Sequence, residues 1–237
     1  DTFDSDIIVG AERIEEYVKL LKGKRVAIVA NHASTVGSAH IVDRLIEDSI
    51  NVIKVFSPEH GFRGNADAGE KVLSEIDPKT KLPIISLYGD NKKPKNDQLE
   101  DVDLILFDLQ DVGVRFYTYI STLHYVIEAA SDLGIPMIVL DRPNPNANYI
   151  DGPILKNGFD SFVGLHPIPV VYGLTIGELA IMINEEGWTS SSSKCNLKVI
   201  SCLNYSHQSE YVLPISPSPN LPNQKSIYLY PSLCFFE

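Results

Sequence analysis

The densest group of potentially catalytic side chains lies in the segment SPEHGFRG, residues 57–64. It places Glu59, His60 and Arg63 within five residues of one another. A carboxyl group and an imidazole can exchange protons with a substrate, and a guanidinium binds carboxylates. Because the segment follows the apolar run 52–56, which predicts a buried strand, it should emerge at the edge of a sheet. Ligands bind at that edge in open α/β folds, so this segment is the first candidate for an active site. The competing interpretation is a polar loop whose glutamate and arginine pair in solvent.

A second polar group follows the apolar run 104–107 in the segment DLQDVGVRFYTY. Asp108 and Asp111 come after the predicted strand, and Arg115 and Tyr117 lie near the start of a predicted long helix. Aromatic rings pack on sugar faces, while carboxylates and guanidinium groups bind hydroxyls and carboxylates. The group therefore suits a polyhydroxylated ligand. The competing interpretation is that Asp111 caps the helix and the tyrosines belong to the core.

Three further polar residues stand at the ends of apolar runs or in stiff segments. Asn31 follows the run 25–30, and Asp141 follows the run 137–140 in the sequence DRPNP. Asn220 lies in the proline-rich segment SPSPNLP, which could form one wall of a cleft. For Asp141 the competing interpretation is an internal ion pair with Arg142. Several polar strand ends at one sheet edge predict the rim of an active site.

The elements that must position these groups follow from the hydrophobic pattern. The expected strands are 25–30, 52–56, 83–87, 104–107 and 137–140, and the expected helices are 13–21, 38–49, 96–102, 118–133 and 176–186. Strands that alternate with helices predict an α/β class, with a Rossmann-like, mostly parallel sheet and helices on both faces. The pattern weakens beyond about residue 150, so residues 150–237 are expected to be irregular and to form part of a cleft.

Composition excludes several functional classes. The net charge of −11 argues against nucleic-acid partners, which require a basic surface. The chain has no transmembrane segment, because no apolar stretch reaches the roughly 18 residues that cross a bilayer. The sequence lacks a G-x-G-x-x-G, a Walker A motif, a G-x-S-x-G elbow and an H-E-x-x-H motif, and its three cysteines lack zinc-site spacing. We therefore expect neither a cofactor nor a metal. A metal-dependent hydrolase built on Glu59, His60, Asp108 and Asp111 remains a minor alternative.

The motifs together resemble one known family, the NamZ-type glycoside hydrolases, also called DUF1343. The resemblance rests on SPEHGFRG, DLQDVGVRFYTYISTL, DRPNP, GLTIGELA and SPNLP, and it runs from about residue 26 to residue 237. It implies a Rossmann-like N-terminal domain followed by a smaller C-terminal domain, with the active site in the cleft between them. The apolar segment 226–237 resembles the family segment just before that second domain. We therefore expect residues 1–237 to form the N-terminal domain, with the C-terminal domain absent.

Characterised members of this family are exo-β-N-acetylmuramidases, so the resemblance implies release of N-acetylmuramic acid from the non-reducing ends of peptidoglycan fragments. It places the catalytic general acid on Glu59, and we expect Asp111 to act as the second carboxyl group. In an alternative mechanism the substrate's own acetamido group attacks. Arg63 or Arg115 would bind the lactyl carboxylate. The expected substrate-binding residues are Asn31, His60, Arg63, Asp108, Arg115, Tyr117, Asp141 and Asn220.

The same resemblance makes peptidoglycan fragments or muramyl sugars the expected partners, together with the family C-terminal domain in cis for full activity. A peptidoglycan substrate predicts a periplasmic or extracellular location, with a signal sequence removed before Asp1. The alternative function is a non-catalytic protein that binds muropeptides or other cell-wall sugars in the same cleft.

Overall fold

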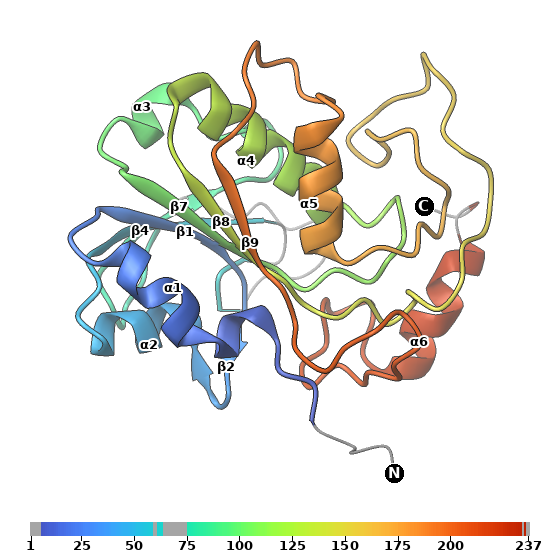
Figure 1. The fold of residues 1–237 in the computed structure, drawn as a ribbon, viewed down its shortest axis with the longest axis horizontal. Coiled ribbons are helices and arrows are strands. Elements are labelled where there is room, and N and C mark those ends of the chain that lie inside the picture. Colours follow the sequence, from blue (N-terminus) through green and yellow to red (C-terminus); the bar gives the residue numbers. More distant parts are fainter. Residues whose placement is uncertain (1–5, 59–60, 64–74, 234, 236–237) are drawn as a thin grey trace.

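The computed structural model describes residues 6–58, 61–63, 75–233 and 235, and a seven-stranded sheet lies at its centre (Figure 1). The strands of this sheet are β1 (Val26–Ala30), β4 (Val52–Ser57), β5 (Glu75–Ile76), β6 (Pro83–Ser86), β7 (Leu104–Asp108), β8 (Met137–Leu140) and β9 (Leu197–Ile200). Their order across the sheet is β5-β6-β4-β1-β7-β8-β9. Every neighbouring pair is parallel except β5 and β6, which are antiparallel.

Strand order locates the edge at which a ligand is expected. If the six parallel strands are counted along the chain, their spatial order is 3-2-1-4-5-6, as in doubly wound sheets of the Rossmann type. The order reverses between β1 and β7, whose pairing extends to Ala30 opposite Asp108. Ligands in such sheets bind at the carboxyl ends of the strands beside this reversal. Asn31 and Asp108 therefore stand at the expected position.

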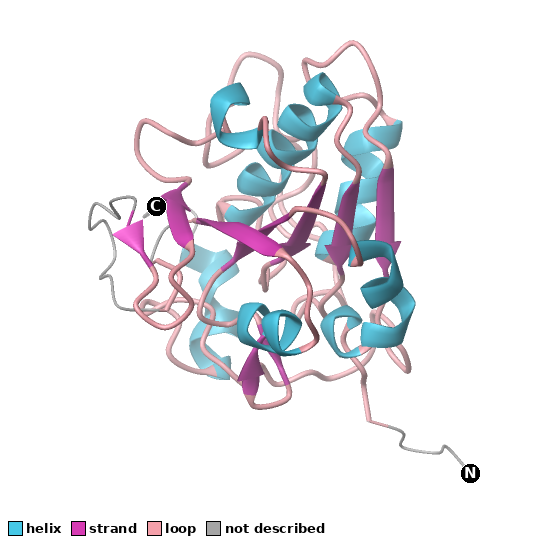
Figure 2. Ribbon diagram, turned by 90° about the vertical axis from the view of Figure 1, so that its left-hand side faces the viewer, coloured by secondary structure: helices cyan, strands magenta, loops and turns pink. Residues whose placement is uncertain are grey.

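Helices cover both faces of the sheet, as Figure 2 shows in a view turned by 90°. The helices are α1 (Ile14–Leu21), α2 (Ile41–Glu47), α3 (Asn96–Leu99), α4 (Tyr119–Leu133), α5 (Ile176–Glu185) and α6 (Gln224–Leu229). Along β1, Val26, Ile28 and Ala30 join the apolar cluster of α1 and α2, while Ala27 and Val29 join that of α4 and α5. This alternation follows from the two-residue period of a strand. The predicted α/β class, with a mostly parallel sheet and helices on both faces, is confirmed.

Some boundaries differ from the sequence-based expectation. Helix α2 starts at Ile41 because residues before it form a small hairpin of β2 (Thr35–Val36) and β3 (Ala39–His40). Gly37 makes the turn with a φ of 57°. The region 150–237 contributes α5, β9, α6 and the 3₁₀ helix η2 (Tyr230–Leu233), joined by long irregular segments. A second 3₁₀ helix, η1 (Gly10–Glu12), precedes α1. Within the described ranges, no helix combines the length and apolar character that crossing a bilayer requires.

Candidate active site at the carboxyl edge of the sheet

The first candidate segment is described only in part. Glu59 and His60 lie outside the described residues. Arg63 is held by two carboxylates: its Nη1 and Nη2 donate to Asp43 over 3.0 Å each, and its Nε and Nη2 donate to Asp77 over 3.2 and 2.8 Å. Burial acts to raise the pKa of Asp43, but hydrogen bonds from Arg63 and Lys79 lower it overall. All three guanidinium nitrogens are thus engaged, and they link the chain after β4 to α2 and to the residue that follows β5.

Asp108, at the end of β7, forms a buried ion pair. Its two carboxylate oxygens accept from Nε and Nη2 of Arg142, at 2.6 and 2.9 Å. Arg142 also donates to the carbonyl of Thr35 over 3.0 Å, and it is only 4% exposed. The internal pair considered for this arginine therefore exists, but its carboxylate comes from Asp108 and not from Asp141. With both oxygens bound to one guanidinium, Asp108 is committed to holding β7 against the loop after β8.

Asp141, at the end of β8, caps helix α5. Its carboxylate accepts from the hydroxyl of Thr175 at 2.9 Å, from the amide of Gly177 at 2.8 Å and from the amide of Arg142 at 3.0 Å. A Cβ at Gly177 would lie 2.7 Å from the Asp141 carboxyl carbon, so only glycine fits there. Burial raises the pKa of Asp141 to about 6. The predicted capping box of Thr175 and Glu178 is also present.

Asn31 joins three segments beside the strand reversal. It is fully buried, and its Nδ2 donates to the hydroxyl of Tyr119 over 2.9 Å. The hydroxyls of Tyr117 and Tyr119 donate to the carbonyl of Pro217 at 3.0 and 3.4 Å. A ring nitrogen of His32 lies 2.8 Å from the neighbouring carbonyl, that of residue 216. The proline-rich segment thus lies against the end of β1 and the start of α4, and Asn220, further along it, is exposed.

Asp111 keeps one oxygen without a described partner. Its Oδ2 accepts from the amide of Gly113 over 2.7 Å and from the hydroxyl of Tyr172. Its Oδ1 is buried and has no hydrogen-bond partner among the described residues. Burial raises the pKa of Asp111 to about 6, although the bonds from Tyr172 and Gly113 act to lower it. The residue does not cap α4, whose N-cap is Thr118. Asp111 is therefore an oriented carboxyl group whose Oδ1 can accept a further hydrogen bond.

Two residues contact Asp111, and only one of them lies in a segment that the sequence analysis singled out. Gly113 has a φ of 76°, and a Cβ there would meet the side chain of Asn144 at 2.2 Å, so glycine is required. This glycine belongs to the predicted DLQDVGVR segment. Tyr172 was not predicted, because it lies in the weakly patterned region after residue 150 and contacts Asp111 from 61 positions away. No local sequence motif predicts that contact.

Arg115 anchors a loop. Its Nη1 donates to the carbonyls of Pro153 and Ile168, at 2.8 and 2.5 Å. The amide of Leu155 also donates to the carbonyl of Ile168, over 3.3 Å. Arg115 therefore closes the neck of the loop 153–168. Asp111 contacts the same stretch of chain, through Tyr172, so both residues of the DLQDVGVR segment hold the region that follows β8.

A metal role finds little support in the described geometry. Both oxygens of Asp108 are occupied by Arg142. Among the residues that the structure describes, no group of three or more histidine, cysteine, aspartate or glutamate side chains is arranged to hold a metal ion. The remaining members of the proposed metal set, Glu59 and His60, lie outside those residues.

Fold and site together define the class: a doubly wound α/β protein with polar side chains gathered at the strand reversal. The family follows from comparison with known proteins. A family model described as "Exo-beta-N-acetylmuramidase NamZ, N-terminal" matches residues 26–225. The chain therefore belongs to the NamZ family, DUF1343, as the motifs predicted.

Relatives support the same assignment. "Peptidoglycan beta-N-acetylmuramidase NamZ" of Bacillus subtilis (strain 168) is 46% identical over 231 residues, which cover 94% of this chain and 55% of the relative. Crystal structures of two DUF1343 family proteins from Bacteroides fragilis NCTC 9343 match with a TM-score of 0.89 each, at 50% and 36% identity. The matches cover 98% and 97% of this chain, but 62% and 60% of those chains. The chain thus spans little more than half the length of the relatives it matches.

Proposed function

We propose that this chain carries the catalytic part of an exo-acting β-N-acetylmuramidase, which releases N-acetylmuramic acid from the non-reducing ends of peptidoglycan fragments. The name of the Bacillus subtilis relative, at 46% identity, supports the substrate class. The observation that carries the proposal is Asp111: a buried carboxyl group near the strand reversal, with Oδ2 fixed by two donors and Oδ1 unpaired among the described residues. Unsatisfied buried carboxylate oxygens are costly, so they point to a functional requirement.

Glycosidic cleavage commonly uses two carboxyl groups on opposite sides of the scissile bond. We propose that Glu59 protonates the leaving oxygen and that Asp111 supplies the second group. With a pKa of about 6, Asp111 is mostly ionised at neutral pH. Its Oδ1 can then accept a hydrogen bond from an attacking water or from the substrate's acetamido N–H. Both the two-carboxyl mechanism and the substrate-assisted one use Asp111 in this ionised, oriented state.

Recognition of muramic acid requires a cation for its lactyl carboxylate. Arg63 is already shared by Asp43 and Asp77, so a substrate carboxylate there would be a third negative group around one positive charge. Arg115 is the second candidate for this contact, and we propose that one of the two arginines, Arg63 or Arg115, makes it. Full activity is proposed to need the further length present in the relatives, because the family cleft lies between two domains. Action on peptidoglycan would place the protein outside the cytoplasmic membrane.

The test is Glu59→Gln in the full-length protein, assayed by release of a chromogenic muramyl glycoside. Loss of a general acid should lower kcat by about 10²–10⁴-fold while circular dichroism stays unchanged. Glu75→Gln, at an exposed residue of β5, is the matched control and should keep wild-type turnover. Unchanged turnover in Glu59→Gln would remove Glu59 from the mechanism. A wild-type protein that binds muramyl disaccharide without cleaving it would favour the alternative, a cell-wall sugar-binding protein.

A further inference from the structure

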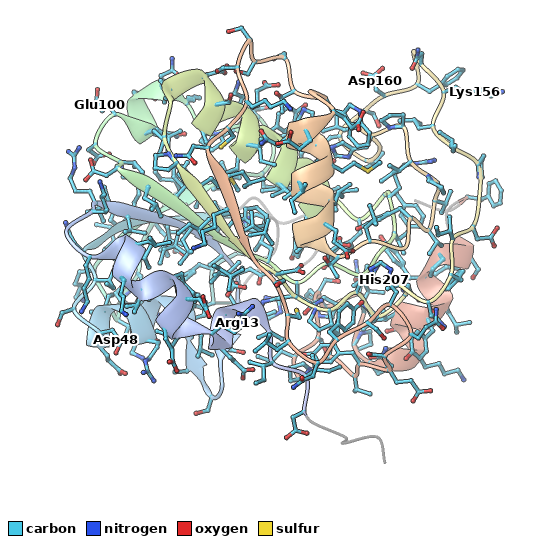
Figure 3. All side chains as sticks on the ribbon, in the orientation of Figure 1. Arg13, Asp48, Glu100, Lys156, Asp160 and His207 are labelled. Carbon is cyan, nitrogen blue, oxygen red and sulfur yellow. The ribbon has the colours of Figure 1, made fainter. Side chains whose placement is uncertain are left out.

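A cavity of about 390 Å³ opens on the side of the sheet that α4 and α5 cover. One wall is formed by residues of α4, His124, Tyr125 and Glu128. The other walls are the loop 153–168, which contributes residues between Leu155 and Pro167, and the chain after α5, which contributes Trp188 and Ser190. Figure 3 labels Asp160 and Lys156 on that loop. None of the predicted site residues lines this cavity, although Arg115 holds the two ends of the loop that forms one of its walls.

The loop wall is fixed to α4 before any ligand arrives. Arg115 bonds the two ends of the loop through the carbonyls of Pro153 and Ile168. In the middle of the loop, the hydroxyl of Ser121 on α4 donates to the carbonyl of Phe162 over 2.6 Å. A wall held at both ends and in the middle loses little conformational entropy when a ligand binds.

The opposite wall is fixed in the same way. Glu128 accepts from the amide of Ser190 over 2.7 Å, and the hydroxyl of Ser131 donates to the carbonyl of Ser193. Glu128 is only 7% exposed, so a buried charged side chain forms part of the cavity floor. Both walls are therefore preorganised around α4, as in small-molecule sites that are largely formed before binding.

The lining combines aromatic rings with hydrogen-bonding groups. Trp188 is half-buried and packs on His166, with ring centroids 5.6 Å apart. Tyr125 is also half-buried and stacks on Phe162 at 6.1 Å, with an interplanar angle of 8°. Because each of these two rings packs against a second ring, its position is fixed, and it can pack on the apolar face of a pyranose. Asn157 and other polar groups on the facing loop can bond its hydroxyls.

The cavity lining carries charges of both signs. Glu128 is paired with Lys93 over 2.8 Å, and Asp160 has Lys156 on the same loop. His124 is bonded to His166 over 3.1 Å, and burial lowers the pKa of His124, which disfavours its charged form. The lining carries no excess of positive charge, so it offers no electrostatic attraction to an anionic sugar such as muramic acid. It suits an uncharged, hydroxyl-rich ligand.

We propose that this cavity is a second carbohydrate site, which binds an uncharged N-acetylhexosamine unit of a glycan chain. The choice of an amino sugar rests on the proposed function, because peptidoglycan alternates muramic acid with N-acetylglucosamine. The existence of the site rests only on the cavity, its aromatic rings and its fixed walls. A glycan held there would be bound at a point separate from the catalytic edge.

The experiment uses the fact that Trp188 is the chain's single tryptophan, so that intrinsic fluorescence reports on this cavity. The 237-residue chain is titrated with N,N′-diacetylchitobiose, which lacks the lactyl group and is no substrate for a muramidase. We expect a saturable change in emission with a midpoint on the order of 1 mM. Asp160→Ala combined with Asn157→Ala should raise that midpoint at least about tenfold, a loss of about 1.4 kcal/mol. The exposed control Asp97→Asn on α3 should leave it unchanged.

Several outcomes would overturn the proposal. One is the absence of a saturable change up to about 20 mM sugar, far above the expected midpoint. Another is an equal midpoint for maltose, which would show that the signal does not report recognition of an amino sugar. A midpoint unaffected by the double substitution would place the binding elsewhere. Failure of this proposal can be distinguished from failure of the proposed function. If both proposals hold, Glu59→Gln removes turnover without altering the fluorescence midpoint. If only the second site exists, the protein binds chitobiose but does not cleave muramyl glycosides.

Discussion

The end of β7 and the loop just after it hold two carboxyl groups, Asp108 and Asp111, in opposite ways. Asp108 is fully buried and gives both oxygens to the guanidinium of Arg142. Asp111 is also buried, but only its Oδ2 is bonded, to Gly113 and Tyr172, and no described cation faces it. The two residues share a short sequence motif and a similar depth. They differ in whether a positive charge compensates the carboxylate.

The difference distinguishes the structural role of Asp108 from the catalytic role that we propose for Asp111. A buried carboxylate paired with arginine in two hydrogen bonds is satisfied and has no capacity for another ligand. A buried carboxylate held on one side by neutral donors remains able to accept a proton or a hydrogen bond on the other. Desolvation makes that arrangement unfavourable for folding, and such costs concentrate at functional sites. Position at the sheet edge alone therefore does not identify the working carboxyl group.

The largest expected effect comes from breaking the structural pair. Arg142→Met removes the only described cation at Asp108 and leaves a buried, unpaired carboxylate, which should lower the free energy of unfolding by about 3–5 kcal/mol. Denaturant unfolding at pH 7 measures the change. The double variant Asp108→Asn with Arg142→Met removes the stranded charge and should recover much of the loss. A loss below about 1 kcal/mol in the single variant would show that the pair is not the structural element described here.

A second prediction concerns Asp111, whose ionisation should lower the free energy of unfolding. Burial raises its folded-state pKa to about 6, above the roughly 3.9 of an unfolded chain. Below pH 4 both states are protonated, but between about pH 4 and pH 6 only the folded state keeps the proton, so the free energy of unfolding falls as pH rises. Two pKa units correspond to about 3 kcal/mol above that window. Asp111→Asn should remove this cost while abolishing activity.

The measurement for Asp111→Asn is denaturant unfolding at pH 4 and pH 8. The variant should match the wild type at pH 4 and exceed it at pH 8. Asp97→Asn, at an exposed position on α3, controls for the loss of one negative charge from an acidic protein. Equal stability of Asp111→Asn and the wild type at both pH values would show that Asp111 carries no desolvation cost in the folded state.

The fold could be predicted where strands are buried on both faces. Apolar runs located β1, β4, β6, β7 and β8 to within one residue, because parallel central strands need apolar side chains on both sides. The lysine inside the run 52–56, Lys54, is itself buried. Strand β9 was missed because it lies at the sheet edge, where Lys198 is exposed and interrupts the run. The β2–β3 hairpin was absorbed into the predicted helix 38–49, since each of its strands has only two residues.

The position of several candidate residues at the sheet edge could be predicted from the sequence, but their interactions could not. Strand ends predicted which polar residues gather at the sheet edge, and Asn31, Asp108 and Asp141 lie there. Their partners depend on tertiary contacts that no local pattern encodes: Arg142 pairs with Asp108, 34 positions away, and not with its neighbour Asp141. Likewise Tyr172 reaches Asp111 from an irregular region. Which carboxylate is compensated can be read only from the packed structure.

A smaller effect is expected at Tyr172, where the change tests the bond that distinguishes Asp111. Tyr172→Phe removes a hydrogen bond to an ionised carboxylate, which should cost about 2 kcal/mol of unfolding free energy at pH 8. Because that bond lowers the pKa of Asp111, its loss should raise the pKa further and shift the acidic limb of the kcat/KM profile to higher pH. Tyr228→Phe, at an exposed residue of α6, is the control. An acidic limb that does not move would mean that another group governs it.

The smallest effect on stability is expected at Arg115, and it decides between a loop anchor and a substrate ligand. Both carbonyls accept from the same nitrogen, Nη1, and the ammonium of a lysine, on a shorter side chain, would reach them less well, so Arg115→Lys should cost only about 1 kcal/mol. As an anchor, Arg115 fixes loop 153–168, and the variant should show faster amide exchange there with KM unchanged. As a ligand for the lactyl group, it should raise KM for muramyl glycosides while exchange in the loop stays the same. If both changes occur, one guanidinium orders the loop and also binds the substrate. Arg115 would then combine a structural and a binding role, whereas Asp108 and Asp111 divide the structural and the proposed catalytic role between two residues.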